Sequence, residues 1–179
     1  MHEPRRYEEQ PKRVFGGVLS DEAYANAITS FIIVCTDIVS IDREKKVFHL
    51  AKRIVHSAKG IWRFGGRQRA GETMRESCVR LMEKELGLTL TPERFSYVQS
   101  TDELFSYRKL PPQEAGSHSL IHIFTVELTP LERETAVVHL DPNEYDIEFG
   151  IQEFDRARLV EEGVYSQLID LYDTVFPHA

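Results

Sequence analysis

Hydrophobic residues recur along the chain with spacings that alternate between those of helices and those of strands. Residues 19–30 show helical spacing, and Ser20 or Asp21 can cap the helix. A β-branched run follows at once, because residues 31–41 and 46–54 are separated only by a turn-forming Asp-Arg-Glu sequence. The pattern predicts a short helix followed by a central hairpin of two strands.

The best-defined boundaries belong to a helix in the middle of the chain. Thr73 and Glu76 have the spacing of a capping box, and Gly87 stands where a helix would end in a left-handed turn. We therefore expect a helix over residues 73–86. Residues 60–72, which are rich in Gly and Arg, are predicted to form the loop that leads into it.

The second half of the chain contains further strands and two closing helices. Strand-like patterns occur at residues 96–101, 120–128, 136–140 and 147–154. Helical spacing returns at residues 155–162 and 164–175. Helices placed before, within and after a mixed sheet indicate α/β or α+β layering.

The first residues differ from the rest because charges and prolines alternate there without hydrophobic period. The pair Gly16-Gly17 then breaks the chain before the first patterned segment. We expect a flexible arm over residues 1–16 and a single domain over residues 17–179. A chain of 179 residues, 41% of them hydrophobic, can bury a core without disulfides or a structural metal.

Charge and cysteine content narrow the class of protein. The 22 Lys and Arg against 29 Asp and Glu give a net charge of -7, which disfavours binding to nucleic acid or to an anionic membrane. Cys35 and Cys78 lack metal-ligand spacing and are typical of reduced thiols. The longest apolar run, residues 31–35, is too short to cross a bilayer. We expect a cytoplasmic protein with neither nucleic-acid nor membrane partners.

One acidic residue of the predicted central helix stands out. At about 100° per residue, Glu85 falls in the middle of an apolar face that also holds Cys78, Leu81 and Met82. A carboxylate on such a face needs a cation, a metal or hydrogen bonds. Two interpretations stay open: a helix-end Glu that reaches solvent or pairs with a nearby Arg, and a ligand for a bound cation.

The preceding loop supplies groups suited to phosphate. Gly65 and Gly66 leave their backbone open to a ligand, and Arg67, Arg69 and Arg80 can hold phosphate oxygens through bidentate contacts. Groups for a cation and groups for an anion therefore converge on one loop and one helix.

Residues 65–90 resemble the Nudix box, G-x5-E-x7-R-E-U-x-E-E-x-G-U with U aliphatic, of metal-dependent hydrolases that act on nucleoside diphosphates linked to another group. Seven box positions match in register: Gly66, Glu72, Arg80, Met82, Glu85, Gly87 and Leu88. The resemblance implies a Nudix-type α/β/α sandwich with a mixed β-sheet. Leu81 and Lys84 stand where the box has acids, which removes ligands for further metal ions and puts the usual attack of water at phosphorus in doubt.

One branch of the family lacks the same two acids. Residues 80–88 are similar to the R-L-x-x-x-E-L-G-L sequence of GDP-mannose mannosyl hydrolases, and the likeness covers roughly residues 19–128. It implies substitution at the anomeric carbon of a nucleotide sugar, which releases a nucleoside diphosphate and a free sugar. A single Mg²⁺ or Mn²⁺ would be held by Glu85 and the carbonyl of Gly66.

The same resemblance implies roles for further polar residues. Arg53, Arg67 and Arg80 would bind the diphosphate and stabilise the charge that grows as it leaves. Asp37 would hold the sugar or assist the cationic character at its anomeric carbon. Glu72 would pair with Arg80 and fix the loop to the helix.

The general base cannot be carried over from that branch. Its loop before the last core strand has adjacent Gln and His residues, whereas residues 143–149 of this chain contain no His. Glu148, and after it Glu144, are the candidate bases. His118 and His122 are more simply strand histidines with structural roles than catalytic groups.

The leading hypothesis is therefore a metal-dependent hydrolase of GDP-mannose or a related nucleotide sugar, with a homodimer implied by the resemblance. Two alternatives remain. The protein could bind a nucleotide or nucleotide sugar without turnover, as the missing acids and missing His would allow. It could also be a pyrophosphatase that uses Glu85, Glu72 and a late-loop Glu to form nucleoside monophosphate and sugar phosphate.

Overall fold

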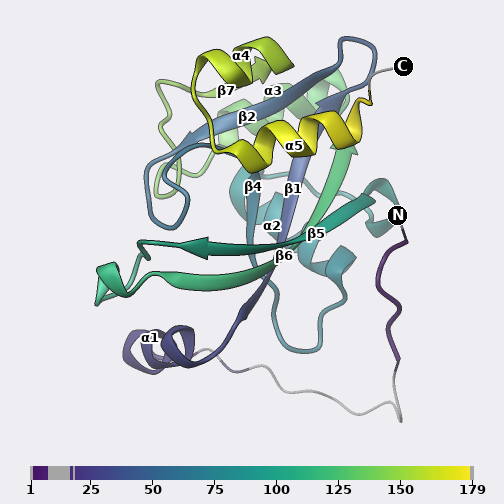
Figure 1. The fold of residues 1–179 in the computed structure, drawn as a ribbon. Helices are drawn as coiled ribbons and strands as arrows, with labels where there is room; N and C mark the ends of the chain where they lie inside the picture. Colours follow the sequence, from purple (N-terminus) through teal and green to yellow (C-terminus); the bar gives the residue numbers. More distant parts are fainter. Residues whose placement is uncertain (1, 8–16, 18, 178–179) are drawn as a thin grey trace.

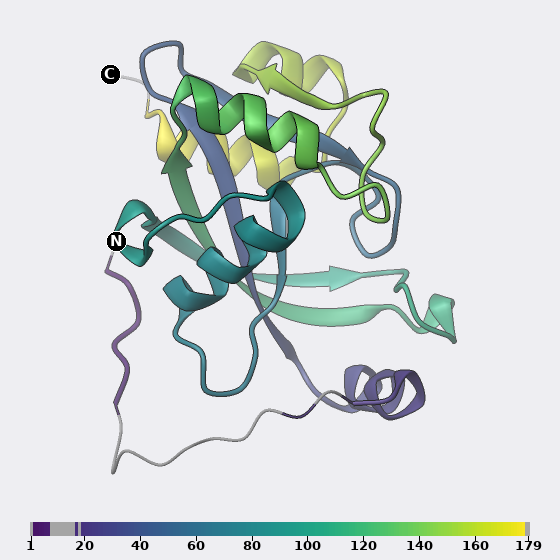
Figure 2. The same ribbon diagram turned by 180° about the vertical axis from the view of Figure 1, so that it is seen from behind.

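The computed structural model describes residues 2–7, 17 and 19–177, and it contains a seven-stranded mixed sheet between two layers of helices (Figures 1 and 2). The α/β/α sandwich is thus confirmed. The helices are α1 (Asp21–Ser30), α2 (Met74–Leu86), α3 (Pro130–His139), α4 (Arg156–Glu161) and α5 (Ser166–Val175). The strands are β1 (Ile33–Asp42), β2 (Val47–Arg53), β3 (Gly60–Trp62), β4 (Phe64–Arg67), β5 (Ser96–Phe105), β6 (Ser117–Glu127) and β7 (Ile151–Phe154).

Strand β1 is the centre of the sheet. On one edge β1 pairs with β6 in parallel. On its other edge β1 pairs with two antiparallel strands, β4 along Cys35–Ile38 and β2 along Ser40–Asp42. The predicted hairpin of β1 and β2 is confirmed. Because β4 and β2 share one edge of β1, residues from both strands come close to the middle of β1.

Helices cover each face of the sheet over a separate apolar core. On one face, α2 and α3 bury residues such as Met82, Leu86 and Ala136 against the sheet. On the other face, α4 and α5 bury residues such as Leu159 and Leu168. Figure 2 shows α2 and α3 in front of the sheet, and Figure 1 shows α4 and α5 on the opposite side.

Helix α2 forms as its sequence predicts. Both hydrogen bonds of the capping box are present between Thr73 and Glu76. Gly87 ends the helix with φ of 64°, the left-handed conformation in which glycine is favoured. The apolar face packs into the core and carries Glu85 with it, so the position of this carboxylate is fixed by the helix.

The strand predicted at residues 136–140 is wrong, because most of this segment belongs to α3. Thr129 caps the helix and shares a second capping box with Glu132, and Pro130 occupies the first turn. The β-branched Val137 and Val138, which suggested a strand, are exposed on the outer side of the helix. The capping residues therefore outweigh the β propensity of the two valines.

Other strand boundaries also differ from the prediction. Strands β3 and β4 lie within residues 60–72, where only a loop was expected. The predicted strand at 147–154 begins only at Ile151, because Asp146 accepts the Gly150 N–H at its carbonyl and the Phe149 N–H at its side chain, which holds a turn. Strands β5 and β6 are both longer than predicted and form an extended hairpin.

Part of the predicted N-terminal arm lies against the domain. The Glu3 carboxylate receives hydrogen bonds of 2.7–3.2 Å from the Arg75 guanidinium near the start of α2. Residues 1 and 8–16 of the arm lie outside the described residues. Among the helices that the structure describes, none is long and apolar enough to cross a membrane.

Candidate active site

Two adjoining cavities open where α1, β1, β4 and the end of α2 meet. The larger, of about 440 Å³, is called the strand pocket here and is lined by residues that include Asp37, His56, Ser57, Arg108, Ser117 and Ser119. The smaller, of about 340 Å³, is called the helix pocket and is lined by residues that include Arg80, Lys84, Glu85 and Glu144. Both are lined by Tyr24, Arg53, Gly65, Gly66 and Arg67, so a single ligand can occupy the two together.

Glu85 lies in the helix pocket and is only 2% exposed. Its Oε2 atom accepts hydrogen bonds from the Tyr145 hydroxyl at 2.6 Å and from the Gly65 N–H at 3.1 Å. Burial raises the pKa of Glu85 to about 7, although these two hydrogen bonds act in the opposite direction. The interpretation of Glu85 as a helix-end residue that reaches solvent is therefore wrong.

Tyr145 is a site residue that the sequence did not reveal. It is buried, and its ring packs against Phe64 with 5.5 Å between centroids. Its loop is fixed at both sides, since Asp141 donates its N–H to the Glu85 carbonyl and Asp146 donates to the Lys52 carbonyl. The one available signal was a lone aromatic residue within the polar sequence Asp-Pro-Asn-Glu-Tyr-Asp.

The donors around Glu85 fit one divalent cation and do not fit a metal cluster. Within the described residues there is no group of three or more His, Cys, Asp or Glu that could hold a metal ion. Leu81 is buried in the core, and the Lys84 ammonium lies 3.9 Å from Glu85 Oε1. One carboxylate, backbone carbonyl oxygens and the oxygens of a bound phosphate form a donor set suited to a hard cation such as Mg²⁺.

Glu72 and Arg80 form the pair that the sequence predicted. Arg80 donates to the two Glu72 oxygens over 2.5 and 2.7 Å and to the Arg67 carbonyl over 3.1 Å, so the pair ties the loop to α2. These contacts use Nε and Nη2. The Nη1 group of Arg80 makes no hydrogen bond within the described part of the chain and stays available to a ligand in the helix pocket.

Two more predicted arginines lie where the pockets meet. The Arg67 guanidinium stacks over the Tyr24 ring at 4.3 Å from its centroid. Arg53 donates to Glu144 over 3.1 Å, and Glu144 also accepts from Lys109 over 3.2 Å. The buried Nε atom of Arg53 has no hydrogen-bond partner among the described residues.

Asp37 lies in the strand pocket and is held by a buried arginine. Its Oδ2 accepts from Arg63 Nε over 2.8 Å, and the same guanidinium donates to Glu103 over 2.8 Å and to Gln167. Burial raises the pKa of Asp37, and the charge of Arg63 opposes this effect. Arg63 had no predicted role, because its partners lie on distant strands and on α5.

Gly65 brings the loop close to Asp37. A Cβ atom at this position would lie 2.4 Å from Asp37 Oδ1 and 2.6 Å from the Thr36 carbonyl, and its φ is 148°. Only glycine therefore permits the contact between β4 and β1 at this point. The same residue donates its N–H to Glu85, so it joins the strand pocket to the helix pocket.

The candidate bases differ in their surroundings. Glu144 lines the helix pocket, whereas Glu148 is exposed in the turn before β7. His118 interacts with Asp102, and His122 with Ser100 over 2.7 Å, on the β5–β6 hairpin. Trp62 is buried in the core that α4 and α5 cover.

Comparisons with known proteins place this geometry in a family. The chain is similar in structure to a MutT NUDIX hydrolase from Burkholderia pseudomallei, with 15% identity, a TM-score of 0.60 and coverage of 82% of this chain and 99% of that one. It is also similar to the NUDIX domain of Shewanella oneidensis NrtR complexed with ADP ribose, with 10% identity, a TM-score of 0.53 and coverage of 85% and 97%. No curated protein is a significant match.

The family profile described as NUDIX domain matches residues 33–166, which include β1, the Gly-Arg loop, α2 and the Tyr145 loop. The match covers most of the sequence and every element that lines the helix pocket except α1, which contributes Tyr24. The protein therefore belongs to the NUDIX domain family.

Proposed function

We propose that this NUDIX protein is a divalent-metal-dependent hydrolase of nucleotide sugars, such as GDP-mannose or a related nucleoside diphosphate hexose, that releases a nucleoside diphosphate and a free sugar. The observation that carries the proposal is a single buried carboxylate, Glu85, next to the guanidinium groups of Arg53, Arg67 and Arg80. Such a site suits a diphosphate that leaves as an intact group.

Binding of the diphosphate is assigned to the helix pocket. Glu85 and the Gly66 carbonyl would hold Mg²⁺ or Mn²⁺, which supplies positive charge to the leaving diphosphate. The Nη1 group of Arg80 and the guanidinium of Arg67 would bind phosphate oxygens directly. Because these groups are fixed by Glu72 and Tyr24 before the ligand arrives, little reorganisation is needed.

The sugar is assigned to the strand pocket, with its anomeric carbon near Asp37. In the proposed step, a water oxygen bonds to that carbon, the bond from the carbon to the diphosphate oxygen breaks, and the diphosphate departs with the electron pair. Arg63 holds Asp37 in place, and the Asp37 carboxylate would stabilise positive charge on the sugar.

The water proton would pass to a carboxylate of the late loop. Glu148 is the base first expected, and Glu144 is the alternative that lines the helix pocket. Partial burial acts to raise the pKa of Glu144, but the charges of Arg53 and Lys109 outweigh it, so its pKa lies below the ordinary value. Separate Glu144→Gln and Glu148→Gln variants distinguish the two, since loss of the base lowers kcat.

Two alternative functions would use the same class of ligand. ADP ribose, which the Shewanella NUDIX domain binds, is also a nucleoside diphosphate joined to a sugar, and this favours the same class of ligand. Attack at phosphorus would yield a nucleoside monophosphate and a sugar phosphate instead. A site that only binds would yield no products.

The test is to incubate the purified protein with a panel of nucleoside diphosphate hexoses and Mg²⁺ or Mn²⁺ and to separate the products. We expect a nucleoside diphosphate and free sugar from the wild type, and loss of both with Glu85→Gln. Glu83→Gln is the matched control, because Glu83 is exposed on the same helix. Monophosphate and sugar phosphate, or ligand binding without turnover, would overturn the proposal.

We also propose a cytoplasmic homodimer. The support for a dimer is a group of exposed apolar residues that follows α1 directly in the chain and comprises Phe31, Ile32 and Val34. None of the residues of α1 is buried, although the helix carries apolar side chains. A second copy of the chain would cover this surface.

A further inference from the structure

Arg108 is a buried cation that no acidic residue accompanies. It lies in the loop between β5 and β6 and is 2% exposed. Its guanidinium donates to the Leu110 and Pro111 carbonyls over 3.1 and 3.3 Å and to the Thr29 hydroxyl over 2.9 Å. All three acceptors are neutral. Within the described part of the chain, no carboxylate lies within 4.0 Å of Arg108.

Three other arginines around the site differ in this respect, whereas Arg67, which is only partly buried, stacks on Tyr24 and has no carboxylate partner among the described residues. Arg63 pairs with two carboxylates, and Arg53 and Arg80 each pair with one. A buried charge normally requires a counter-charge, because water no longer solvates it. The three hydrogen bonds of Arg108 also leave two of its five N–H groups without an acceptor among the described residues.

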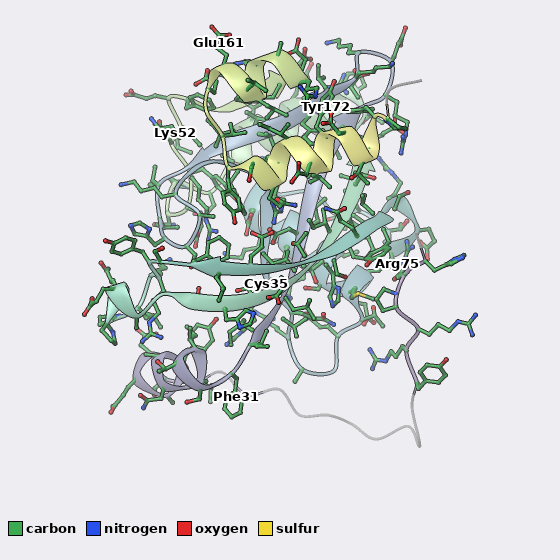
Figure 3. All side chains as sticks on the ribbon, in the orientation of Figure 1. Phe31, Cys35, Lys52, Arg75, Glu161 and Tyr172 are labelled. Carbon is green, nitrogen blue, oxygen red and sulfur yellow. The ribbon has the colours of Figure 1, made fainter. Side chains whose placement is uncertain are left out.

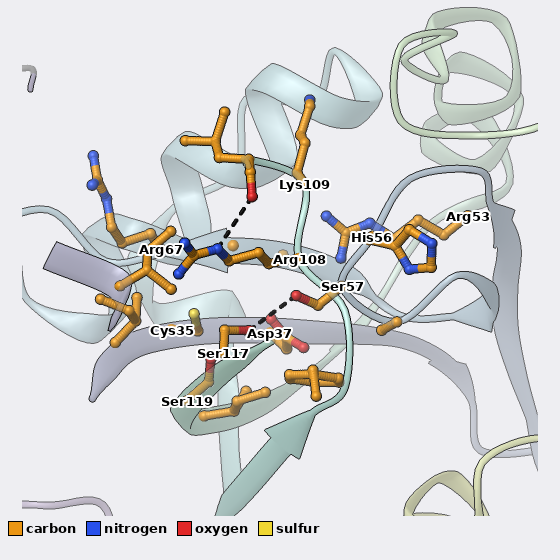
Figure 4. Close-up of a pocket in the computed structure, with 18 of the residues that line it drawn as sticks. Cys35, Asp37, Arg53, His56, Ser57, Arg67, Arg108, Lys109, Ser117 and Ser119 are labelled. Carbon is orange, nitrogen blue, oxygen red and sulfur yellow. Dashed lines mark hydrogen bonds between the residues drawn. The ribbon is translucent and has the colours of Figure 1, made fainter. Parts of the chain in front are cut away.

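Arg108 lines the strand pocket together with a row of hydroxyl groups. Figure 4 shows its side chain extending across the pocket opposite Asp37, Ser117 and Ser119. The Oγ atoms of Ser57 and Ser117 are 3.1 Å apart, and both residues line the strand pocket. These groups suit a ligand that carries several hydroxyls, and Arg108 suits an acidic substituent on that ligand.

We infer that Arg108 binds an anionic group on the glycosyl part of the ligand, so that the preferred substrates are nucleotide sugars with an acidic sugar, such as a nucleotide-linked uronic acid. The inference rests on the proposed function for the assignment of the sugar to the strand pocket. The diphosphate lies in the helix pocket next to Arg80, and the acidic substituent supplies the counter-charge that Arg108 lacks.

The test compares matched ligands that differ only in the acidic group. Titration calorimetry in EDTA, which prevents metal-dependent turnover, measures the affinities for UDP-glucuronate against UDP-glucose and for GDP-mannuronate against GDP-mannose. For at least one pair, we expect wild-type protein to bind the acidic ligand at least tenfold more tightly. In Arg108→Gln this ratio should fall close to one, while the affinity for the neutral ligand changes less than threefold.

Further variants separate charge from structure. Arg108→Lys keeps the charge and should retain most of the preference, even if the loop is weakened. Thr29→Val removes the contact with α1 without a change of charge and should keep the full preference. Arg43→Gln, at an exposed surface position, controls for net charge.

The outcomes also separate this inference from the proposed function. If the wild type binds both members of every pair clearly and with equal affinity, the role of Arg108 is overturned. The proposed nucleotide-sugar site would still stand. An unchanged ratio in a folded Arg108→Gln variant has the same two consequences. Failure to bind any nucleotide sugar, in EDTA or with Mg²⁺, overturns both proposals.

Discussion

At the scale of single residues, we predict that alanine substitution affects stability very differently at two adjacent glycines. Gly65 has a φ of 148°, and an added Cβ would clash with Asp37 and with the Thr36 carbonyl. At Gly66 the nearest atom to an added Cβ is Leu81 Cδ2, at 3.4 Å. We expect Gly65→Ala to lower the free energy of unfolding by roughly 3 kcal/mol, from strain and overpacking together, and Gly66→Ala to change it by less than about 1 kcal/mol.

Urea denaturation of the two variants measures this difference directly. Gly66→Ala is the control, because it adds the same methyl group one residue away. Equal stability of the two variants would contradict the close contact between β4 and β1.

Glu85 provides a second prediction, which concerns pH. Its pKa is about 7 in the folded protein and 4.5 as the ordinary value, so the native state binds a proton more tightly than the unfolded chain. For an acid with a raised pKa, the free energy of unfolding falls as pH rises from 4.5 to 7. Glu85→Gln removes this loss and should make the metal-free protein more stable than wild type above pH 7, by up to roughly 3 kcal/mol.

The comparison is made by urea denaturation in EDTA at several pH values. The stability difference between Glu85→Gln and wild type should grow between pH 4.5 and 7 and then level off. Glu83→Gln, on the exposed side of the helix, is the control variant. A constant difference for Glu85→Gln would mean that burial does not hold this carboxylate in its protonated form.

At the scale of elements, local signals explain which parts of the fold the sequence reveals. Helix α2 is predictable because its capping box, its apolar face and Gly87 all agree. Helix α3 has an equally complete capping box at Thr129, but Val137 and Val138 obscure it with β propensity. Caps are local and can be read from the chain, whereas the exposure of the two valines depends on tertiary packing.

The residues of the candidate site also differ in whether local sequence predicts them. Glu85 is predictable because a carboxylate interrupts an apolar face within one helix. Its partner Tyr145 is 60 residues away, and the partners of Arg63 are 26, 40 and 104 residues away. The neutral surroundings of Arg108 likewise depend on contact with α1. No local spacing encodes such contacts, so the polar network of the site could not be predicted from the sequence and became visible only in the structure.

The α3 capping box gives the third prediction. Hydrogen bonds from Arg94 and from the cap at Thr129 lower the pKa of Glu132 to about 2. For an acid with a lowered pKa, the stabilisation is present above pH 4.5 and is lost as pH falls towards 2. We expect Glu132→Gln to cost about 1 kcal/mol at pH 7 and progressively less between pH 4.5 and 2.

Thermal denaturation across this pH range, followed by circular dichroism, measures the effect. Glu134→Gln is the matched control, because Glu134 lies two residues further along α3 and is exposed. A difference that stays constant down to pH 2.5 would refute the assigned titration of Glu132.

At the scale of the whole molecule, α1 links the proposed dimer to the site. The helix has no buried residue, and Phe31, which follows it directly, is 69% exposed and points away from the sheet in Figure 3. The same helix places Tyr24 over Arg67 and Thr29 against Arg108. A second copy that contacts α1 would therefore affect the strand pocket through Tyr24 and Thr29.

Deletion of residues 1–30 should convert the proposed dimer into a monomer, as measured by light scattering. It should also weaken the binding of nucleotide sugars at least tenfold, because α1 lines both pockets and its Tyr24 stacks against Arg67. Deletion of residues 1–7 is the control, since it leaves α1 in place and removes contacts of the N-terminal segment with Arg75 and with the loop before α2. Phe31→Ser with Ile32→Ser tests the surface alone: it should give a monomer in which Tyr24 and Thr29 remain. A dimer that survives both changes would show that α1 and the residues after it do not form the interface.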